Sequence, residues 1–203
     1  RHIKNRGISA DRSGWLLDRL DPIVNGHPKK LFLMIGTNDL AAGVSPEEVA
    51  ANIGKLLDRF AEESPWTKIY VQSILPVNGV DTKAKAKNHW KKGAEIIEAN
   101  KLIEALCEGR KNVLYIDVYS ALVDQKGMLD KRYTNDGLHL MGEGYLAYFR
   151  RRRLERAAEL LRTPPQRVQD IAAQVGYESQ GRFAQAFYDQ FRLTPLEYRR
   201  EGR

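Results

Sequence analysis

Two residues that could carry out acid–base chemistry lie three positions apart late in the chain. They begin and end the sequence Asp136-Gly137-Leu138-His139, and a carboxylate beside an imidazole is a pair that many hydrolytic sites use to move a proton. On its own, this stretch could also be an ordinary loop or a weak metal-binding pair. A metal site would need a third ligand, and none stands at a recognisable spacing. The sequence therefore indicates a candidate acid–base pair and no metal site.

A second polar stretch, Gly36-Thr37-Asn38-Asp39, directly follows a run of five apolar residues at positions 31–35. Taken alone, it is an ordinary turn. A continuous apolar run that ends at a glycine is typical of a strand buried on both faces of a parallel sheet. In such sheets the reactive groups lie beyond the carboxyl ends of the strands, so this polar stretch stands where a site would form.

The segments between these two stretches alternate between strand and helix patterns. A helix is predicted from the Ser-Pro-Glu-Glu start at 45–48 to about residue 63, because the serine can cap it and the second glutamate completes a capping box. Strands are predicted at 69–75 and 113–118, with a long helix over 84–107 between them. The inward residues expected on that helix are Ile96, Ile97, Leu102, Ile103 and Leu106. This order predicts an α/β fold with a doubly wound parallel sheet.

Three stretches together resemble a known family. Arg6-Gly7-Ile8-Ser9, the stretch at 36–39 and the stretch at 136–139 resemble, in that order, the second, third and fifth conserved blocks of SGNH (GDSL-type) hydrolases. The resemblance spans residues 1 to about 146. It implies a truncated flavodoxin-like three-layer domain that hydrolyses a small acyl ester or carbohydrate ester through a Ser/His/Asp arrangement, with no cofactor.

The resemblance also implies a role for each candidate residue. His139 would take the proton from a serine hydroxyl and return it to the leaving alcohol, and Asp136 would hold the imidazole in its working tautomer. The side-chain amide of Asn38 and the backbone N–H of Gly7 would face the developing oxyanion.

The serine nucleophile is the part of the family pattern that the sequence does not supply. In the family it lies in a Gly-Asp-Ser-like block at the end of the first strand, upstream of every stretch quoted above. The chain begins after that point, and neither Gly-Asp-Ser nor Gly-Asn-Ser occurs in it. Ser9 and Ser13 are the nearest hydroxyls, but neither stands on the expected strand-to-helix turn. We therefore expect no nucleophile and an impaired ester hydrolase.

Positive charge is concentrated at the C-terminal end. Residues 148–203 contain 12 arginines, no lysine and 7 acidic residues, so they carry +5 of the formal net charge of +7. Such a segment is a candidate nucleic-acid surface, although a solvated helix face has the same composition. The abrupt loss of lysine marks a compositional seam near residues 145–150, where no Pro/Gly/Ser-rich linker occurs.

The arginine-rich segment has the pattern of a helix-turn-helix unit. One helix is expected over residues 144–161, then a short helix, a turn at Gly176 and a last helix capped by Ser179. The inward residues expected on the first helix are Leu146, Phe149, Leu154, Ala157, Ala158 and Leu161. Those expected on the last are Phe183, Phe187 and Phe191.

Residues 145–203 resemble the C-terminal half of AraC/XylS-type transcription regulators. The stretches that carry the resemblance are residues 153–157, 171–172, 175–179, Phe183, Phe187 and Pro195-x-x-Tyr198-Arg199. The resemblance implies that the chain binds double-stranded DNA with the helix after Ser179 in the major groove. That family has two helix-turn-helix units, of which only the joining helix and the second unit occur here, so we expect modest and salt-dependent affinity.

Several polar residues of this segment are candidates for DNA contacts. Gln180, Arg182 and Gln185 lie away from the phenylalanines, and amide and guanidinium groups suit the edges of adenine and guanine. The arginines expected at phosphates, which position a protein without specifying sequence, are Arg150, Arg152, Arg167 and Arg199. Asp189 would repel phosphate. Arg192 stands where the family has glycine, and a left-handed conformation there would cost about 1 kcal/mol.

The sequence thus predicts a hydrolase-like domain over residues 1–146 and a helix-turn-helix module over residues 147–203. The main interpretation is a chimeric, DNA-binding chain whose hydrolase-like part is impaired, and the alternative is an active SGNH-type esterase with a non-functional helical tail. No apolar run reaches the roughly 20 residues that cross a bilayer, no secretory signal opens the chain, and Cys107 has no partner for a disulfide. We therefore expect a cytoplasmic protein without a membrane partner, while the oligomeric state stays open.

Overall fold

The computed structural model describes residues 3–79, 88–163 and 166–201. The chain divides into two compact units, Arg1–Met141 and Gly142–Arg203. Each unit has its own apolar core, and each is described by itself.

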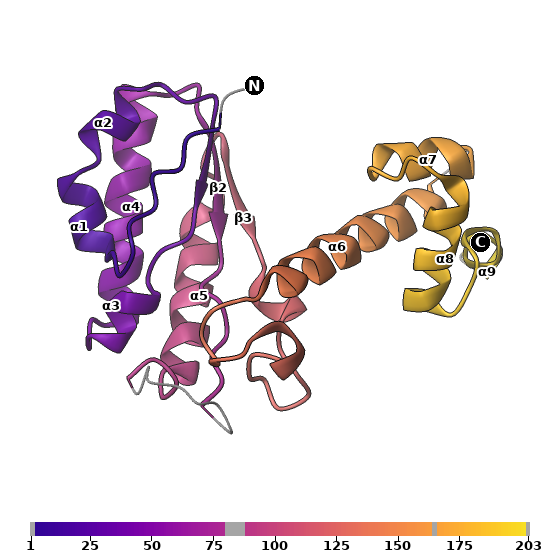
Figure 1. Ribbon diagram of the computed structural model, residues 1–203. Coiled ribbons are helices and arrows are strands. Elements are labelled where there is room, and N and C mark those ends of the chain that lie inside the picture. The colour runs from indigo at the N-terminus through magenta and orange to yellow at the C-terminus, as the bar shows by residue number, and fades with distance from the viewer. Residues whose placement is uncertain (1–2, 80–87, 164–165, 202–203) are drawn as a thin grey trace. The chain divides into compact units, whose positions relative to one another are not determined.

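The first unit is built on a parallel three-stranded sheet in the order β1-β2-β3, drawn in Figure 1. The strands are β1 (Lys30–Leu33), β2 (Lys68–Gln72) and β3 (Val113–Ile116). In the register, Leu31 lies beside Ile69, which lies beside Val113. The predicted α/β class and the parallel sheet are confirmed.

Helices fill the connections between the strands. α4 (Pro46–Glu63) joins β1 to β2, α5 (Gly93–Cys107) joins β2 to β3, and these two helices pack against each other. The shorter elements of this unit are α1 (Ser13–Asp18), α2 (Asp21–Val24), α3 (Thr37–Ala41) and the 3-10 turns Tyr119–Ala121 and Lys131–Tyr133. The side chain of Ser45 caps α4 as predicted, accepting from the backbone N–H of Glu48 at 3.2 Å.

In the described residues, helices cover one face of this sheet. Ile69 and Val71 are 3% and 1% exposed on the side of α4 and α5, whereas Phe32 and Leu114 on the other side are 62% and 57% exposed. The prediction of strands buried on both faces is therefore wrong. The parallel strands follow one another across the sheet in the order β1-β2-β3. Because crossovers between parallel strands are nearly always right-handed, this order places both connecting helices on the same face.

The helix between β2 and β3 also differs from its prediction. It begins at Gly93. Residues 84–87 of the predicted start lie outside the described residues, and residues 88–92 are described and are not helical, so the predicted start is wrong there. Ile96 and Ile103 are buried as expected, but Ile97 is 44% exposed and is a wrong assignment. Only one side of a helix faces the core, and adjacent residues point in directions about 100° apart. Ile96 lies on the side that faces the core, so Ile97 faces solvent.

The described residues of the second unit form four helices. They are α6 (Gly142–Arg162), α7 (Val168–Gln174), α8 (Gln180–Phe191) and α9 (Pro195–Glu201). The later turns of α6 supply Leu154, Ala157, Ala158 and Leu161 to a core shared with Phe183 and Phe187 of α8. Leu146 and Phe149, predicted to face inward, are 68% and 57% exposed, because they precede the turns of α6 that this core covers. None of the described helices is long and apolar enough to cross a bilayer.

Candidate functional site

The candidate acid–base pair is in direct contact. Nδ1 of His139 lies 2.6 Å from Oδ2 of Asp136, and the other carboxylate oxygen accepts from the backbone N–H groups of Leu138 (2.9 Å) and His139 (2.8 Å). Burial raises the pKa of Asp136, but the hydrogen bonds from the imidazole and from these two N–H groups outweigh it and hold the pKa well below its ordinary value. The imidazole is 77% exposed, so its Nε2 atom is the nitrogen that can meet a substrate.

A tight loop fixes this pair. Gly137 has a φ of +78°, a conformation that glycine adopts without strain, and its N–H donates to Oγ1 of Thr134 at 2.9 Å. The carbonyl of Gly137 accepts from the backbone N–H of Asn78 at 2.8 Å. Asn78 belongs to the segment that follows β2, and Leu138 packs against the core. The loop is therefore tied to the carboxyl end of the sheet.

Asn38 lies at the start of α3, just beyond the end of β1. Its Nδ2 donates to the backbone oxygen of Asp11 at 3.0 Å, and its Oδ1 lies 3.1 Å from Nε2 of His89. An amide nitrogen has two hydrogens, so one N–H of Asn38 is left for another acceptor. Both contacts restrain the side chain, which is an arrangement that an electrostatic donor to an oxyanion requires.

His89 is a residue of this site that the sequence did not indicate. Burial, and to a lesser extent the charge of His139, lowers its pKa. His89 and Asn38 are 51 positions apart, and no motif connects them. Only the folded chain could bring His89 to the candidate site.

Gly7 is engaged in its own turn. Its N–H donates to Oδ1 of Asn5 at 2.9 Å, and the residue is exposed. Ser9 is exposed as well. Ser13 is 3% exposed, and its hydroxyl donates to Asp39 at 2.6 Å and accepts from Asn52 at 3.0 Å. Among the described residues, no serine hydroxyl forms a hydrogen bond with His139.

Asp39, the last residue of the polar stretch after β1, has a structural contact. It is 1% exposed and accepts from both the backbone N–H and the hydroxyl of Ser13, at 2.9 and 2.6 Å. A carboxylate at the start of α1 offsets the partial positive charge of the free N–H groups there. Asp39 thus holds α1 against α3, beside the candidate site.

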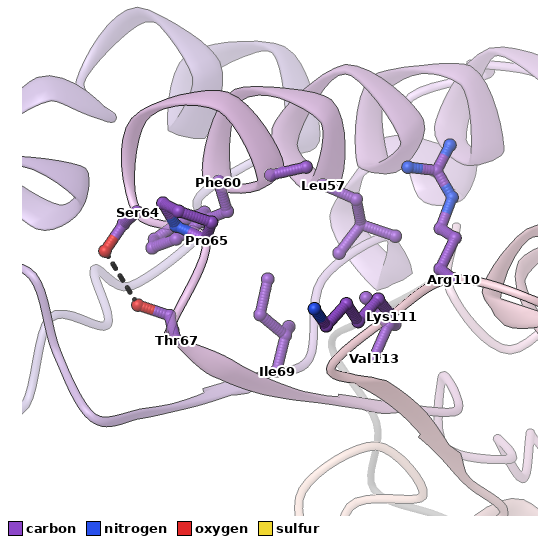
Figure 2. Close-up of a pocket in the computed structure, with 10 residues that line it drawn as sticks. Leu57, Phe60, Ser64, Pro65, Thr67, Ile69, Arg110, Lys111 and Val113 are labelled. Atoms are coloured by element: carbon purple, nitrogen blue, oxygen red, sulfur yellow. Dashed lines mark hydrogen bonds between the residues drawn. The ribbon is translucent and has the colours of Figure 1, made fainter.

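A pocket of about 130 Å³ lies away from this chemistry, near the amino ends of β2 and β3 (Figure 2). Its floor is apolar, with Leu57, Phe60 and Ile69. The hydroxyls of Ser64 and Thr67 hydrogen-bond to each other at 2.9 Å. Neither Asp136 nor His139 lines it, so the candidate site is the exposed carboxyl edge of the sheet and not this pocket.

In the second unit, α8 presents a polar face opposite its phenylalanines. Phe183 and Phe187 are fully buried, while Gln180, Arg182 and Gln185 are exposed. The hydroxyl of Ser179 caps the helix, accepting from the N–H of Arg182 at 3.4 Å. Among the described residues, the Arg182 guanidinium forms no ion pair. This side chain is therefore available to an external acceptor.

The arginines expected at phosphates differ in their contacts. Arg152 pairs with Glu155 and Arg167 with Asp170, both at 3.0 Å, and both pairs are exposed. Arg199 donates to the backbone oxygen of Gln166 at 2.7 Å. Arg150 is exposed and has no ion pair within the described ranges. Of the four, Arg150 is the one whose guanidinium has neither an ion pair nor a hydrogen bond among the described residues.

Arg153, inside the same arginine run, is a structural residue. Its guanidinium donates to the backbone oxygens of Val175 and Gly176 and lies 4.3 Å from the ring centre of Tyr177. These contacts join α6 to the turn between α7 and α8. The turn itself uses Gly176 at a φ of +79°, which favours glycine.

Comparison with known proteins agrees with the fold and the geometry of both units. The family model for the GDSL-like Lipase/Acylhydrolase family matches residues 1–147, and the model for a helix-turn-helix domain matches residues 129–201. A GDSL hydrolase-like unit is thus fused to an AraC-type helix-turn-helix unit. By the longer match, the chain belongs to the GDSL-like lipase/acylhydrolase family.

Solved structures resemble this chain over most of its length. One from Streptococcus pneumonia, provisionally named a platelet activating factor, is 35% identical with a TM-score of 0.64, covering 72% of this chain and 68% of that one. An acetylxylan esterase variant from Geobacillus stearothermophilus is 16% identical with a TM-score of 0.56, covering 86% of this chain and 72% of its own. At that identity the second likeness concerns the fold alone.

Curated relatives resemble the second unit. The transcriptional regulator AlkR of Acinetobacter baylyi is 37% identical over 82 residues, which are 40% of this chain and 27% of that protein. The regulatory protein SoxS of Escherichia coli is 48% identical over 52 residues, 26% of this chain and 49% of SoxS. The matched region therefore spans about half or less of the length of these relatives.

Proposed function

We propose that this chain is a sequence-specific DNA-binding protein that reads duplex DNA with α8. The observation that carries the proposal is the division of α8 into two faces. One face is locked into the core by Phe183 and Phe187, and the other presents Gln180, Arg182 and Gln185 to solvent. A rigid helix with amide and guanidinium groups on its free side fits the major groove, where these groups pair with adenine and guanine edges.

Phosphate contacts supply the affinity in this proposal. Arg150 carries an unshared charge, whereas Arg152 and Arg167 would first have to give up exposed ion pairs. Exposed pairs of this kind are worth at most about 1 kcal/mol, so a phosphate can displace them. Arg199 has a part-buried backbone contact and is the least available of the four.

The test is fluorescence anisotropy of a labelled duplex with the full chain at 50 and 200 mM salt. With three or four phosphate contacts, the affinity should fall roughly 40- to 150-fold between these concentrations. Arg150→Gln should weaken binding to every sequence and reduce the salt slope by about 1. Arg132→Gln in the first unit, which removes the same charge, is the matched control. The absence of binding at 50 mM salt would contradict the proposal.

The second candidate function is hydrolysis of a small acyl or carbohydrate ester by the first unit. The 2.6 Å contact between Asp136 and His139 favours it, because it leaves Nε2 of the imidazole as an exposed base. The free N–H of Asn38 would serve as an oxyanion donor, with the N–H of Gly7 joining it only if that group left Asn5. His139 lacks a serine partner among the described residues, so an activity near background is expected.

The rate at which the purified chain hydrolyses an aryl acetate tests whether the first unit is an active esterase. Turnover by the purified chain should equal that of His139→Ala. A rate at least tenfold above that of His139→Ala would show that a nucleophile reaches His139. The interpretation as an active esterase would then replace the interpretation as an impaired hydrolase. Asn38→Ala, which removes the proposed oxyanion donor, should lower such a rate by a further 10²–10³-fold or so.

A further inference from the structure

On the exposed face of α8, Gln185, which the proposed function uses, is hydrogen-bonded to Asp189, which it does not use. Nε2 of Gln185 donates to Oδ1 of Asp189 at 2.9 Å, and both side chains are exposed. We propose that Asp189, held by Gln185, is a specificity-determining residue that selects a cytosine beside the adenine that Gln185 reads. The inference rests on the proposed DNA binding and deepens it.

The hydrogen bond fixes what Gln185 can offer to a base. It uses one of the two Nε2 hydrogens, so the second hydrogen and Oε1 remain as one donor and one acceptor. Adenine presents the complementary set in the major groove, with the N7 acceptor and the N6 amino donor. Because Asp189 already restrains the amide, less side-chain entropy is lost when the base binds.

Asp189 differs from Gln185 in that it offers no donor, since an ionised carboxylate only accepts hydrogen bonds. Its Oδ2 atom is unused, and within residues 166–201 no cation pairs with it. Beside a polyanion this charge is unfavourable unless the DNA supplies a donor. Cytosine supplies its N4 amino group, whereas guanine and thymine present acceptors at the same edge. Asp189 would therefore act mainly by rejecting wrong bases, which is a common route to specificity.

The spacing on the helix fits two neighbouring base pairs. Gln185 and Asp189 are one turn apart, which is about 6 Å along the axis, and successive base pairs are about 3.4 Å apart. The two bases should therefore lie within two base pairs of each other. Gly181, one turn before Gln185, has no side chain, and a Cβ there would meet only Oγ of Ser179, at 3.8 Å. The backbone of α8 can thus come close to the groove.

Selection from a randomised duplex library tests the assignment with the full chain. The variants are Asp189→Asn and Gln185→Ala, with Glu201→Gln on α9 as the charge-matched control. The natural chain should enrich a cytosine within two base pairs of an adenine. Asp189→Asn should reduce the discrimination between cytosine and guanine about tenfold and leave the adenine preference. It should also bind random duplex a few-fold more tightly, since a repulsive charge is gone.

The possible outcomes separate this inference from the proposed function. Gln185→Ala should lose the adenine preference, and Glu201→Gln should select the same site as the natural chain. If Asp189→Asn selects an unchanged site, or if Glu201→Gln shifts the site equally, the inference is overturned while DNA binding stands. If the natural chain binds no duplex even at low salt, the proposed function fails and the inference fails with it. Circular dichroism of each variant checks that α8 is intact.

Discussion

Nδ1 of His139 lies 2.6 Å from Oδ2 of Asp136, and the same carboxylate accepts from two backbone N–H groups of its own loop. One side chain therefore both orients the imidazole and holds the loop together. A carboxylate in this position has a structural value that does not depend on turnover. The chain could keep this geometry whether or not it hydrolyses an ester.

Asp136→Asn should lower the stability of the first unit by about 1 kcal/mol at pH 7, because charge-assisted hydrogen bonds become neutral ones. The folded-state pKa of Asp136 is lowered, so its contribution is complete above the unfolded pKa of about 3.9 and is lost as the pH falls. Urea unfolding of the two proteins between pH 2.5 and 7 should show a stability difference that is constant above about pH 5 and narrows steadily as the pH falls below about 4. A difference that stayed constant down to pH 2.5 would contradict the assignment.

His89 should make the first unit less stable in mild acid. Its folded-state pKa is lowered, mainly by burial, so the unfolded chain takes up a proton more readily. The contribution of neutral His89 to the free energy of unfolding is therefore complete above the unfolded pKa of about 6.5 and declines as the pH falls below it. His89→Gln should flatten the pH dependence of unfolding between about pH 6.5 and 5. The side-chain amide resonance of Asn38 should also shift, as it loses its partner at 3.1 Å.

Asp39→Ala should destabilise the first unit by about 3 kcal/mol, because a buried N–H and hydroxyl of Ser13 lose a charged acceptor. Tryptophan fluorescence during urea unfolding follows this unit alone, since all three tryptophans precede residue 142. The control is Asp18→Ala on exposed α1 surface, which should change stability by less than about 0.5 kcal/mol. Equal effects of the two substitutions would rule out the capping role.

Arg153→Gln should destabilise the second unit by about 1–2 kcal/mol, as two carbonyl contacts and a cation–π contact with Tyr177 are lost. Arg150→Gln removes the same charge three residues earlier, yet it should leave stability unchanged and weaken DNA binding. Thermal unfolding followed by circular dichroism, combined with anisotropy, separates the two effects. Identical behaviour of the two variants would mean that the arginines at 150–153 act only through their charge.

Arg192→Gly should stabilise the second unit by about 0.5–1 kcal/mol. Arg192 ends α8 at a φ of +59° and is a non-glycine residue in the left-handed region. It stands where the regulator family has glycine, which adopts this conformation without strain. Arg192→Ala is the control, because it removes the charge but keeps the strain. Thermal unfolding should show a gain for glycine only. A gain for alanine of the same size would assign the effect to charge.

Local patterns were sufficient for some of these features. The acid–base pair, its glycine turn and the capping serine of α4 each involve residues within four positions of one another, so their spacing alone constrains their geometry. The apolar runs likewise predicted a parallel sheet. Exposure was harder to predict, because Phe32 and Leu114 have the same apolar character as Ile69, and only the side on which the crossover helices lie distinguishes them.

The sequence by itself determined the two kinds of unit, the Asp136–His139 pair and the polar face of α8, since periodicity and short-range spacing dictate these. Only the tertiary structure decided that His89 contacts Asn38 and that Asp39 accepts hydrogen bonds from Ser13. It also decided that Arg153 binds the carbonyls of a turn, while Arg150 stays unpaired. Those contacts join residues 22 to 51 positions apart, or choose among identical side chains in one run. Their partners are fixed by packing of distant elements, which no local pattern records.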